Sequence, residues 1–172
     1  MNRLVKLSAE RRKQAEKILL EGKVIPTLMK YGEPEIIGSF ALDVMYNPDI
    51  DIVVLTPNPQ QSALGALNDF ISQKRFQKYE YGDFVKFKRA NRPQGFIINL
   101  HSHTTSPKWE IEIWFLKSIT KEQRLHMRLK NKINDTNRNQ ILQLKQRRAT
   151  RKLSKHDLSS MDIYRKAIKN MH

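Results

Sequence analysis

Residues 36–55 constrain the fold more than any other stretch, because two acidic residues stand inside an apolar run. An apolar pair runs into Gly38-Ser39, nine residues follow, and Asp49 and Asp51 then alternate with apolar side chains. In a strand, residues two apart point to the same face. Parallel carboxylates repel each other unless a cation lies between them, and oxygen ligands favour a hard divalent ion such as Mg²⁺. We therefore expect a metal-binding strand here.

A second acidic strand is predicted at residues 109–116, where Glu110 and Glu112 alternate with isoleucine and aromatic residues. Burial of a glutamate is costly without a partner, so this pair also needs an explanation. A third carboxylate is usual where two metal ions are held about 3.5–4 Å apart. If this strand lies next to the first, either glutamate supplies that carboxylate and acts as general base on an acceptor hydroxyl.

The Gly38-Ser39 pair is typical of a phosphate-binding turn. Glycine lets the backbone turn sharply and come close to a ligand. The segment that follows is expected to begin as a short helix, so its N–H groups face outward together with the Ser39 hydroxyl. A triphosphate bridged by metal to Asp49 and Asp51 fits both halves of the motif.

The remaining periodicity predicts an α+β fold, a mixed sheet flanked by helices with a basic C-terminal helical extension. Residues 1–116 form the expected catalytic domain and residues 117–172 the extension. Helices are expected at 8–22 (Ser8 as N-cap), 24–31 and 61–74, and strands at 34–37, 49–55, 79–89, 96–101 and 109–116. The extension is expected to hold a helix after Thr120, a break over 131–139, a helix from 141, and a last helix capped by Ser154.

The charge of the chain is uneven. The formal net charge is +15, of which residues 1–116 contribute +3 and residues 117–172 contribute +12. Such a block favours a polyanionic partner, and a nucleic acid could be held through Arg147, Arg148, Arg151, Lys152 and Lys155. A solvated helix face in a basic chain explains the same pattern, so both interpretations stay open.

Several classes of protein are not expected. The sequence has no apolar stretch near 18 residues and no apolar core of a signal peptide at its start, so a cytoplasmic protein without membrane contact is predicted. It has no cysteine, which removes disulfides and cysteine-based zinc sites. His101 and His103 are interpreted as surface loop histidines, because no further metal ligand is near in sequence.

Together these motifs resemble the DNA polymerase beta-like nucleotidyltransferase superfamily. The resemblance covers roughly residues 34–116 and implies that Gly38 and Ser39 contact the nucleotide phosphates. It also implies that Asp49, Asp51 and a third acid bind two Mg²⁺ ions. The third acid matches Glu112 or Glu110, and Glu112 is favoured because Ile111-Glu112-Ile113 is the cleaner triplet. The segment with Asp43 is also similar to lincosamide and aminoglycoside nucleotidyltransferases, which implies a structural or substrate-proximal role for Asp43.

The function implied by this resemblance is transfer of a nucleoside monophosphate from a nucleoside triphosphate to an acceptor hydroxyl, with release of pyrophosphate. The acceptor is an RNA, such as a tRNA end, or a small molecule such as an aminoglycoside. The alternative is a catalytically inactive protein of the same fold that acts as a nucleic-acid-binding or toxin–antitoxin module. The oligomeric state is left open.

Overall fold

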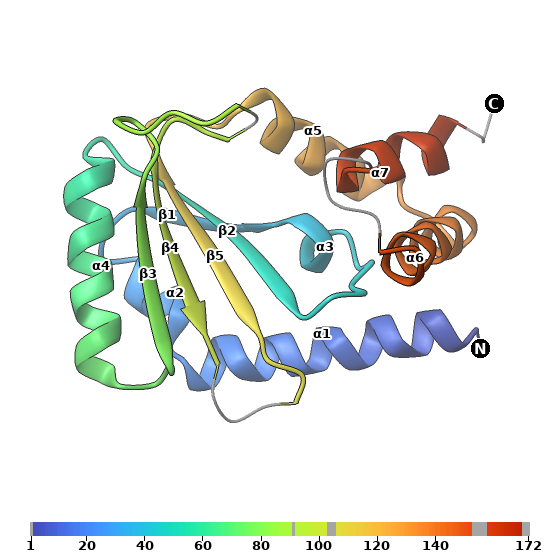
Figure 1. The fold of residues 1–172 in the computed structure, drawn as a ribbon, viewed down its shortest axis with the longest axis horizontal. Coiled ribbons are helices and arrows are strands. Elements are labelled where there is room, and N and C mark those ends of the chain that lie inside the picture. The colour runs from blue at the N-terminus through green and yellow to red at the C-terminus, as the bar shows by residue number, and fades with distance from the viewer. Residues whose placement is uncertain (1, 91, 103–105, 153–157, 170–172) are drawn as a thin grey trace.

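A mixed five-stranded sheet forms the centre of the computed structural model, which describes residues 2–90, 92–102, 106–152 and 158–169 (Figure 1). The strand order is β1-β2-β5-β4-β3, with β2 and β5 parallel and all other neighbours antiparallel. The elements are α1 (Arg3–Glu21), α2 (Val24–Leu28), β1 (Glu33–Ile37), α3 (Gly38–Ala41), β2 (Asp49–Leu55), α4 (Pro59–Gln73), β3 (Lys78–Asp83), β4 (Phe96–His101), β5 (Glu110–Leu116), α5 (Lys121–Leu129), a 3-10 turn (Lys130–Lys132), α6 (Asp135–Thr150) and α7 (Ser160–Lys169).

One face of the sheet is apolar and is covered by α1, α2 and α4. Alternate residues of β2 and β5, among them Ile50, Ile52 and Ile113, are fully buried on this face. Because side chains alternate along a strand, the residues between them point to the opposite face. The predicted acidic residues of both strands lie on that opposite face, which the three helices leave open.

A second apolar core joins the C-terminal helices to the N-terminal half of the chain. It contains buried residues of α6 and α7, such as Ile141 and Tyr164, together with Leu42 and Val44 from the connection between α3 and β2. Figure 1 shows α6 and α7 beside α3 and the start of α1, on the side of the molecule away from α4. The helices after residue 120 are therefore packed next to the Gly38-Ser39 turn. The division of the chain at residue 116 stays a prediction.

The predicted fold class is confirmed, whereas three element boundaries were wrong. The first helix starts at Arg3 and is capped by Asn2, whose side chain accepts a hydrogen bond from Leu4 N at 3.0 Å. Ser8, the expected cap, is instead buried on the inner side of this helix. The strand expected over 79–89 ends at Asp83, because the Asp83 carboxylate accepts bonds from the next backbone N–H groups and closes a turn.

The third boundary lies in the segment rich in Asn and Asp, which was expected to be a break. Only its first part is a break, because Asn134 and Asn137 form a reciprocal capping box that starts α6 at Asp135. Ser154, the expected cap of the last helix, lies outside the described residues. The described part of that helix begins at Ser160. Within the described segments, no helix has the length and apolar character needed to cross a membrane.

Candidate active site

The Gly38-Ser39 turn lies directly against one of the two predicted metal ligands. Gly38 has a φ of +68°, in the left-handed region that favours glycine. A Cβ at this position would collide with the carboxylate of Asp51. The Ser39 side chain is buried, and its hydroxyl has no hydrogen-bond partner among the described residues. The turn therefore brings a buried polar group, still unpaired, next to the acidic strand.

The two predicted acidic strands are neighbours. In the parallel pairing of β2 with β5, Asp49 lies opposite Glu110 and Asp51 lies opposite Glu112. Neighbouring strands are about 4.8 Å apart, and paired residues point to the same face. The four carboxylates therefore form two adjacent rows on the open face of the sheet. Carboxylates at this spacing repel one another unless cations lie between them.

Glu112 already has two donors. Trp114 Nε1 donates to its Oε1 at 2.7 Å, and an Arg92 NH group donates to Oε1 and Oε2 at 3.2 and 3.4 Å. The Glu112 side chain is 25% exposed and that of Arg92 is 44% exposed. Arg92 lies between β3 and β4, so the guanidinium reaches the carboxylate from a loop and can leave it without moving a strand. Sequence reasoning gave no role to Arg92.

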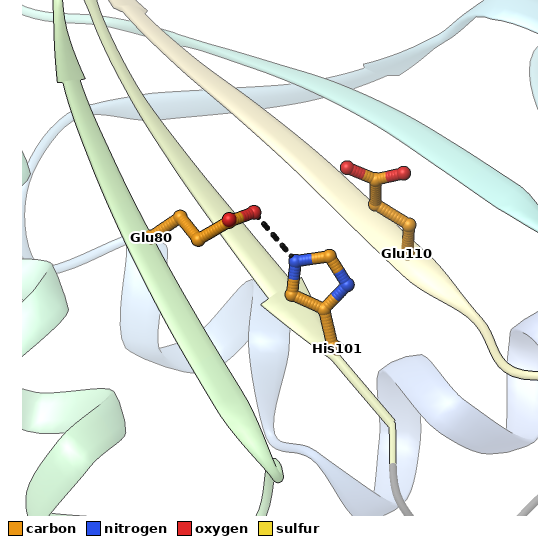
Figure 2. A group of neighbouring side chains, drawn as sticks. All are labelled: Glu80, His101 and Glu110. Carbon is orange, nitrogen blue, oxygen red and sulfur yellow. Dashed lines mark hydrogen bonds and ion pairs between the residues drawn. The ribbon is translucent and has the colours of Figure 1, made fainter.

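Glu110 faces a different set of neighbours, which Figure 2 shows with His101 and Glu80. His101 is the last residue of β4 and lies opposite Glu110 in the pairing with β5. The interpretation of His101 as a loop histidine was therefore wrong: it is a partly buried strand residue. His103 lies outside the described residues. The predicted strand 96–101 already included His101, and this was the signal that it could belong to the sheet.

The C-terminal helices bring aromatic and basic side chains close to the two aspartates. Burial raises the pKa of the Tyr164 hydroxyl, and the charges of Asp51 and Asp49 raise it further. Lys145 is buried in α6, donates to the Val44 carbonyl at 2.9 Å, and has its amine 5.4 Å from the centre of the Tyr164 ring. A buried cation thus lies beside the Gly38-Ser39 turn and the acidic strand.

His126 completes this group from α5. Its ring lies edge-on to Tyr164, with ring centres 5.5 Å apart, and neither ring nitrogen has a hydrogen-bond partner in the described part of the chain. Burial, aided by the charge of Lys145, lowers the pKa of His126 to about 4, so the ring is neutral at pH 7. The sequence held a signal for Lys145, because Ile141, Lys145 and Arg148 recur at i, i+4 and i+7 on one helix face.

Two other predicted residues have structural contacts. The Asp43 carboxylate lies 3.8 Å from Arg12 of α1 and 3.4 Å from Arg138 of α6, so it joins both helices to the loop after α3. Arg148 was placed in a nucleic-acid-binding run. It is buried and donates to the Leu158 carbonyl at 3.1 Å, so it stabilises the packing of α6 against α7. Lys155 of the same run lies outside the described residues.

The fold is similar to that of several solved structures. No protein-family model matches the sequence, and no curated protein matches it. Among solved structures, the polymerase core of the RNA surveillance complex TRAMP has a TM-score of 0.59 at 17% identity, covering 92% of this chain and 53% of that one. Cid1 in complex with the UTP analogue UMPNPP has a TM-score of 0.58 at 18% identity, covering 92% of this chain and 47% of that one. A cytoplasmic RNA terminal U-transferase has a TM-score of 0.54 at 17% identity, covering 83% of this chain and 45% of that one.

These comparisons define the class of fold. The chain spans about half the length of the solved chains it matches. Identities of 17–18% establish the fold alone. The predicted nucleotidyltransferase-type fold is thereby confirmed, and the assignment of Gly38, Ser39 and the acidic residues to catalysis stays a prediction.

Proposed function

We propose that this protein is a metal-dependent nucleotidyltransferase, which transfers a nucleoside monophosphate from a nucleoside triphosphate to an acceptor hydroxyl. The observation that carries the proposal is the in-register pairing of Asp49 and Asp51 with Glu110 and Glu112, with Gly38 packed against Asp51. Oxygen donors in two rows suit hard divalent ions, and two Mg²⁺ ions are the expected set. Asp49, Asp51 and Glu112 would hold them, with Glu110 as the alternative third ligand.

Two features of the chain fit a triphosphate beside these ligands. The buried, unpaired Ser39 hydroxyl is available to the β- and γ-phosphates, and the glycine before it lets the backbone approach them. Lys145 supplies a buried positive charge on the helical side of the same turn. Bound divalent ions would neutralise phosphate charge and align the reacting oxygens.

The reaction then follows from positioning. The acceptor hydroxyl oxygen forms a bond to the α-phosphorus, the bond from that phosphorus to the α–β bridging oxygen breaks, and pyrophosphate leaves. The hydroxyl proton passes to the carboxylate of Glu112 or Glu110. Since Arg92 bonds to Glu112 in this structure, the guanidinium must turn away before Glu112 binds a metal ion or accepts a proton.

An RNA end is the acceptor that we favour. The similar folds belong to an RNA terminal U-transferase, a poly(U) polymerase and the core of an RNA surveillance complex, as their names state. Residues 117–172 carry a net charge of +12, which attracts a polyanion and does nothing for a neutral or cationic small molecule. An aminoglycoside-like acceptor remains the second candidate within the same activity.

The test of the activity is incubation with each labelled nucleoside triphosphate, Mg²⁺ and total RNA or aminoglycosides, followed by measurement of label transfer. Wild-type protein should label RNA, and the double variant Asp49→Asn/Asp51→Asn should lose activity by at least 10³-fold. Label transfer or pyrophosphate release that survives the double variant would refute the enzyme proposal.

The contribution of the basic helices is tested by charge removal, because truncation would expose Leu42 and Val44. Arg147 and Arg151 are exposed on α6 and just beyond it, so Arg147→Gln/Arg151→Gln should leave the fold intact. We expect weaker RNA binding. The slope of the logarithm of the binding constant against the logarithm of the salt concentration should become shallower by about 2, one for each lost phosphate contact. Lys23→Asn/Lys74→Asn removes two exposed charges elsewhere and serves as the matched control. Equal effects of both variants would exclude a specific RNA surface on α6.

A second candidate function follows from the Arg92–Glu112 contact. A guanidinium that neutralises the third carboxylate permanently would leave an inactive nucleic-acid-binding protein of the same fold. Trp114 donates to Glu112 and therefore reports on it by fluorescence, in a Trp109→Phe background. If the site is active, Mn²⁺ should quench this emission and Arg92→Gln should strengthen the quenching. Emission unchanged by Mn²⁺ in both proteins would favour the inactive candidate.

A further inference from the structure

Three side chains from neighbouring strands meet at one end of the open sheet face. Glu80 of β3, His101 of β4 and Glu110 of β5 each offer one ligand atom, and these atoms all lie within 4.8 Å of one another. Figure 2 shows the imidazole between the two carboxylates, with its Nε2 turned to Glu80. The Nε2 atom lies 2.8 Å from a Glu80 Oε2 atom. The cluster is set by strand register, since His101 pairs with Glu110 and Glu80 pairs with the strand residue two before His101.

We propose that Glu80, His101 and Glu110 bind a divalent transition-metal ion, with Zn²⁺ as the best-fitting metal. The distances between the three ligand atoms are close to those in a metal centre. Imidazole and carboxylate ligands bind Zn²⁺ at about 2.0–2.2 Å, which places ligand atoms about 3.3 Å from one another. His101 Nε2 and Glu80 Oε2, which are 2.8 Å apart, must separate slightly to admit the ion. The ligand atoms here need small rotations only, and the side chains of Glu80 and His101, 43% and 26% exposed, stand on a face where such rotations are open.

The charge balance of the cluster supports a cation. Lys78 Nζ lies 2.6 Å from Glu80 Oε1 and thereby offsets one carboxylate. Among the residues that the structure describes, the Glu110 side chain has neither a hydrogen bond nor an ion pair. The residue opposite it in the parallel pairing is Asp49, which is also acidic. The neighbouring Asn99 Oδ1 is also buried and unpaired within the described segments. Oxygen acceptors without donors are the environment in which a bound cation is most stabilising.

The ligand types decide which cation fits. A site of carboxylates alone suits Mg²⁺, Ca²⁺ or Mn²⁺, whereas an imidazole nitrogen favours Zn²⁺ and related later transition metals. With Glu110 in this site, Asp49, Asp51 and Glu112 remain for the nucleotide-linked ions, so the proposal selects Glu112 over Glu110 as their third ligand. Binding of Zn²⁺ at the site does not depend on nucleotide transfer.

Direct metal binding tests the proposal on the full chain without nucleotide. Zn²⁺ is titrated calorimetrically into wild-type protein in excess Mg²⁺, which occupies sites made only of oxygen ligands. We expect one Zn²⁺ per chain. His101→Ala and Glu80→Gln should each weaken Zn²⁺ binding at least tenfold, because loss of a residue that only orients a ligand already costs about 10–100-fold in metal affinity. His172→Ala removes a histidine elsewhere in the sequence and should bind as wild type. Circular dichroism confirms that each variant is folded.

Two further measurements make the outcome specific. The double variant Asp49→Asn/Asp51→Asn should keep Zn²⁺ binding, although it abolishes nucleotide transfer if the proposed function is correct. In ¹⁵N-labelled protein, Zn²⁺ should shift the imidazole nitrogen signals that disappear in His101→Ala. Any one of three results would overturn the proposed site. They are wild-type affinity for Zn²⁺ in His101→Ala, loss of Zn²⁺ binding in the Asp49→Asn/Asp51→Asn variant, and loss of Zn²⁺ binding in His172→Ala.

Discussion

Replacement of Gly38 by alanine tests how the turn and the acidic strand are joined. The φ of +68° puts an L-residue in the left-handed region, which costs about 1–2 kcal/mol relative to glycine. The added Cβ would also collide with the Asp51 carboxylate, and overpacking of this kind costs about 1–3 kcal/mol. We therefore expect Gly38→Ala to lower the free energy of unfolding by roughly 2–5 kcal/mol and the melting temperature by roughly 4–20 °C.

The same substitution should reduce nucleotide transfer more than it reduces stability. The collision displaces the Asp51 carboxylate, and a displacement of about 1 Å in a catalytic group costs roughly 100-fold in rate. The assay measures label transfer at a temperature where urea denaturation shows the variant to be folded. Ala66→Gly in the buried side of α4 is the matched control, because it costs about 1–2 kcal/mol in a helix interior and lies on the face of the sheet opposite the carboxylates.

Two results would refute this reasoning. If Gly38→Ala unfolds at the wild-type urea concentration, the left-handed backbone and the contact with Asp51 are not properties of the folded chain. If the variant is destabilised as expected but transfers label at the wild-type rate, Asp51 is not a catalytic group. Loss of activity in Ala66→Gly equal to that in Gly38→Ala would assign the effect to general instability.

Three further substitutions have distinct expected results. Ser39→Ala removes a buried hydroxyl without a partner among the described residues, so urea denaturation should show a change below about 1 kcal/mol, whereas the dissociation constant for nucleoside triphosphate should rise several-fold. Asp43→Asn should cost less than about 1 kcal/mol, since its ion pairs are half exposed, and unchanged transfer would exclude a substrate role. Because burial lowers the pKa of His126 to about 4, the unfolded chain binds a proton first, and wild-type stability should fall between pH 6.5 and 4. His126→Gln should remove that loss in urea titrations at both pH values.

The acidic strands were the most predictable part of the molecule. The strand 49–55 was predicted with the bounds that the structure shows, and Glu110 and Glu112 were assigned correctly to one face of a strand. Strict alternation of acidic residues and isoleucines fits a strand better than a helix, because a helix would place carboxylates on the same face as the apolar side chains. The register of β2 with β5 could not be predicted, since parallel neighbours far apart in the chain are selected by packing of the whole sheet.

The surroundings of the site were less predictable for the same reason. Arg92 and Glu80 come from two segments without local motifs, and only the fold brings them to the acidic rows. The helical spacing of Lys145 indicates a buried position but not its place beside the Gly38-Ser39 turn. The first helix was misjudged because a serine before an apolar stripe is a common cap, whereas here Ser8 is buried in the helix interior. Local capping signals decide helix ends only where burial does not compete.

The distribution of charge connects these observations to function. The carboxylates of Asp49, Asp51, Glu80, Glu110 and Glu112 lie on one sheet face, although the chain has a formal net charge of +15. Such a face repels nucleotide and RNA phosphates unless cations cover it, while the basic helices attract them. Metal ions are therefore needed for substrate to reach the sheet at all. Binding of a non-hydrolysable nucleoside triphosphate analogue to wild-type protein should therefore require divalent metal. Metal-free wild-type protein that binds the analogue as tightly as metal-loaded protein would contradict this electrostatic division.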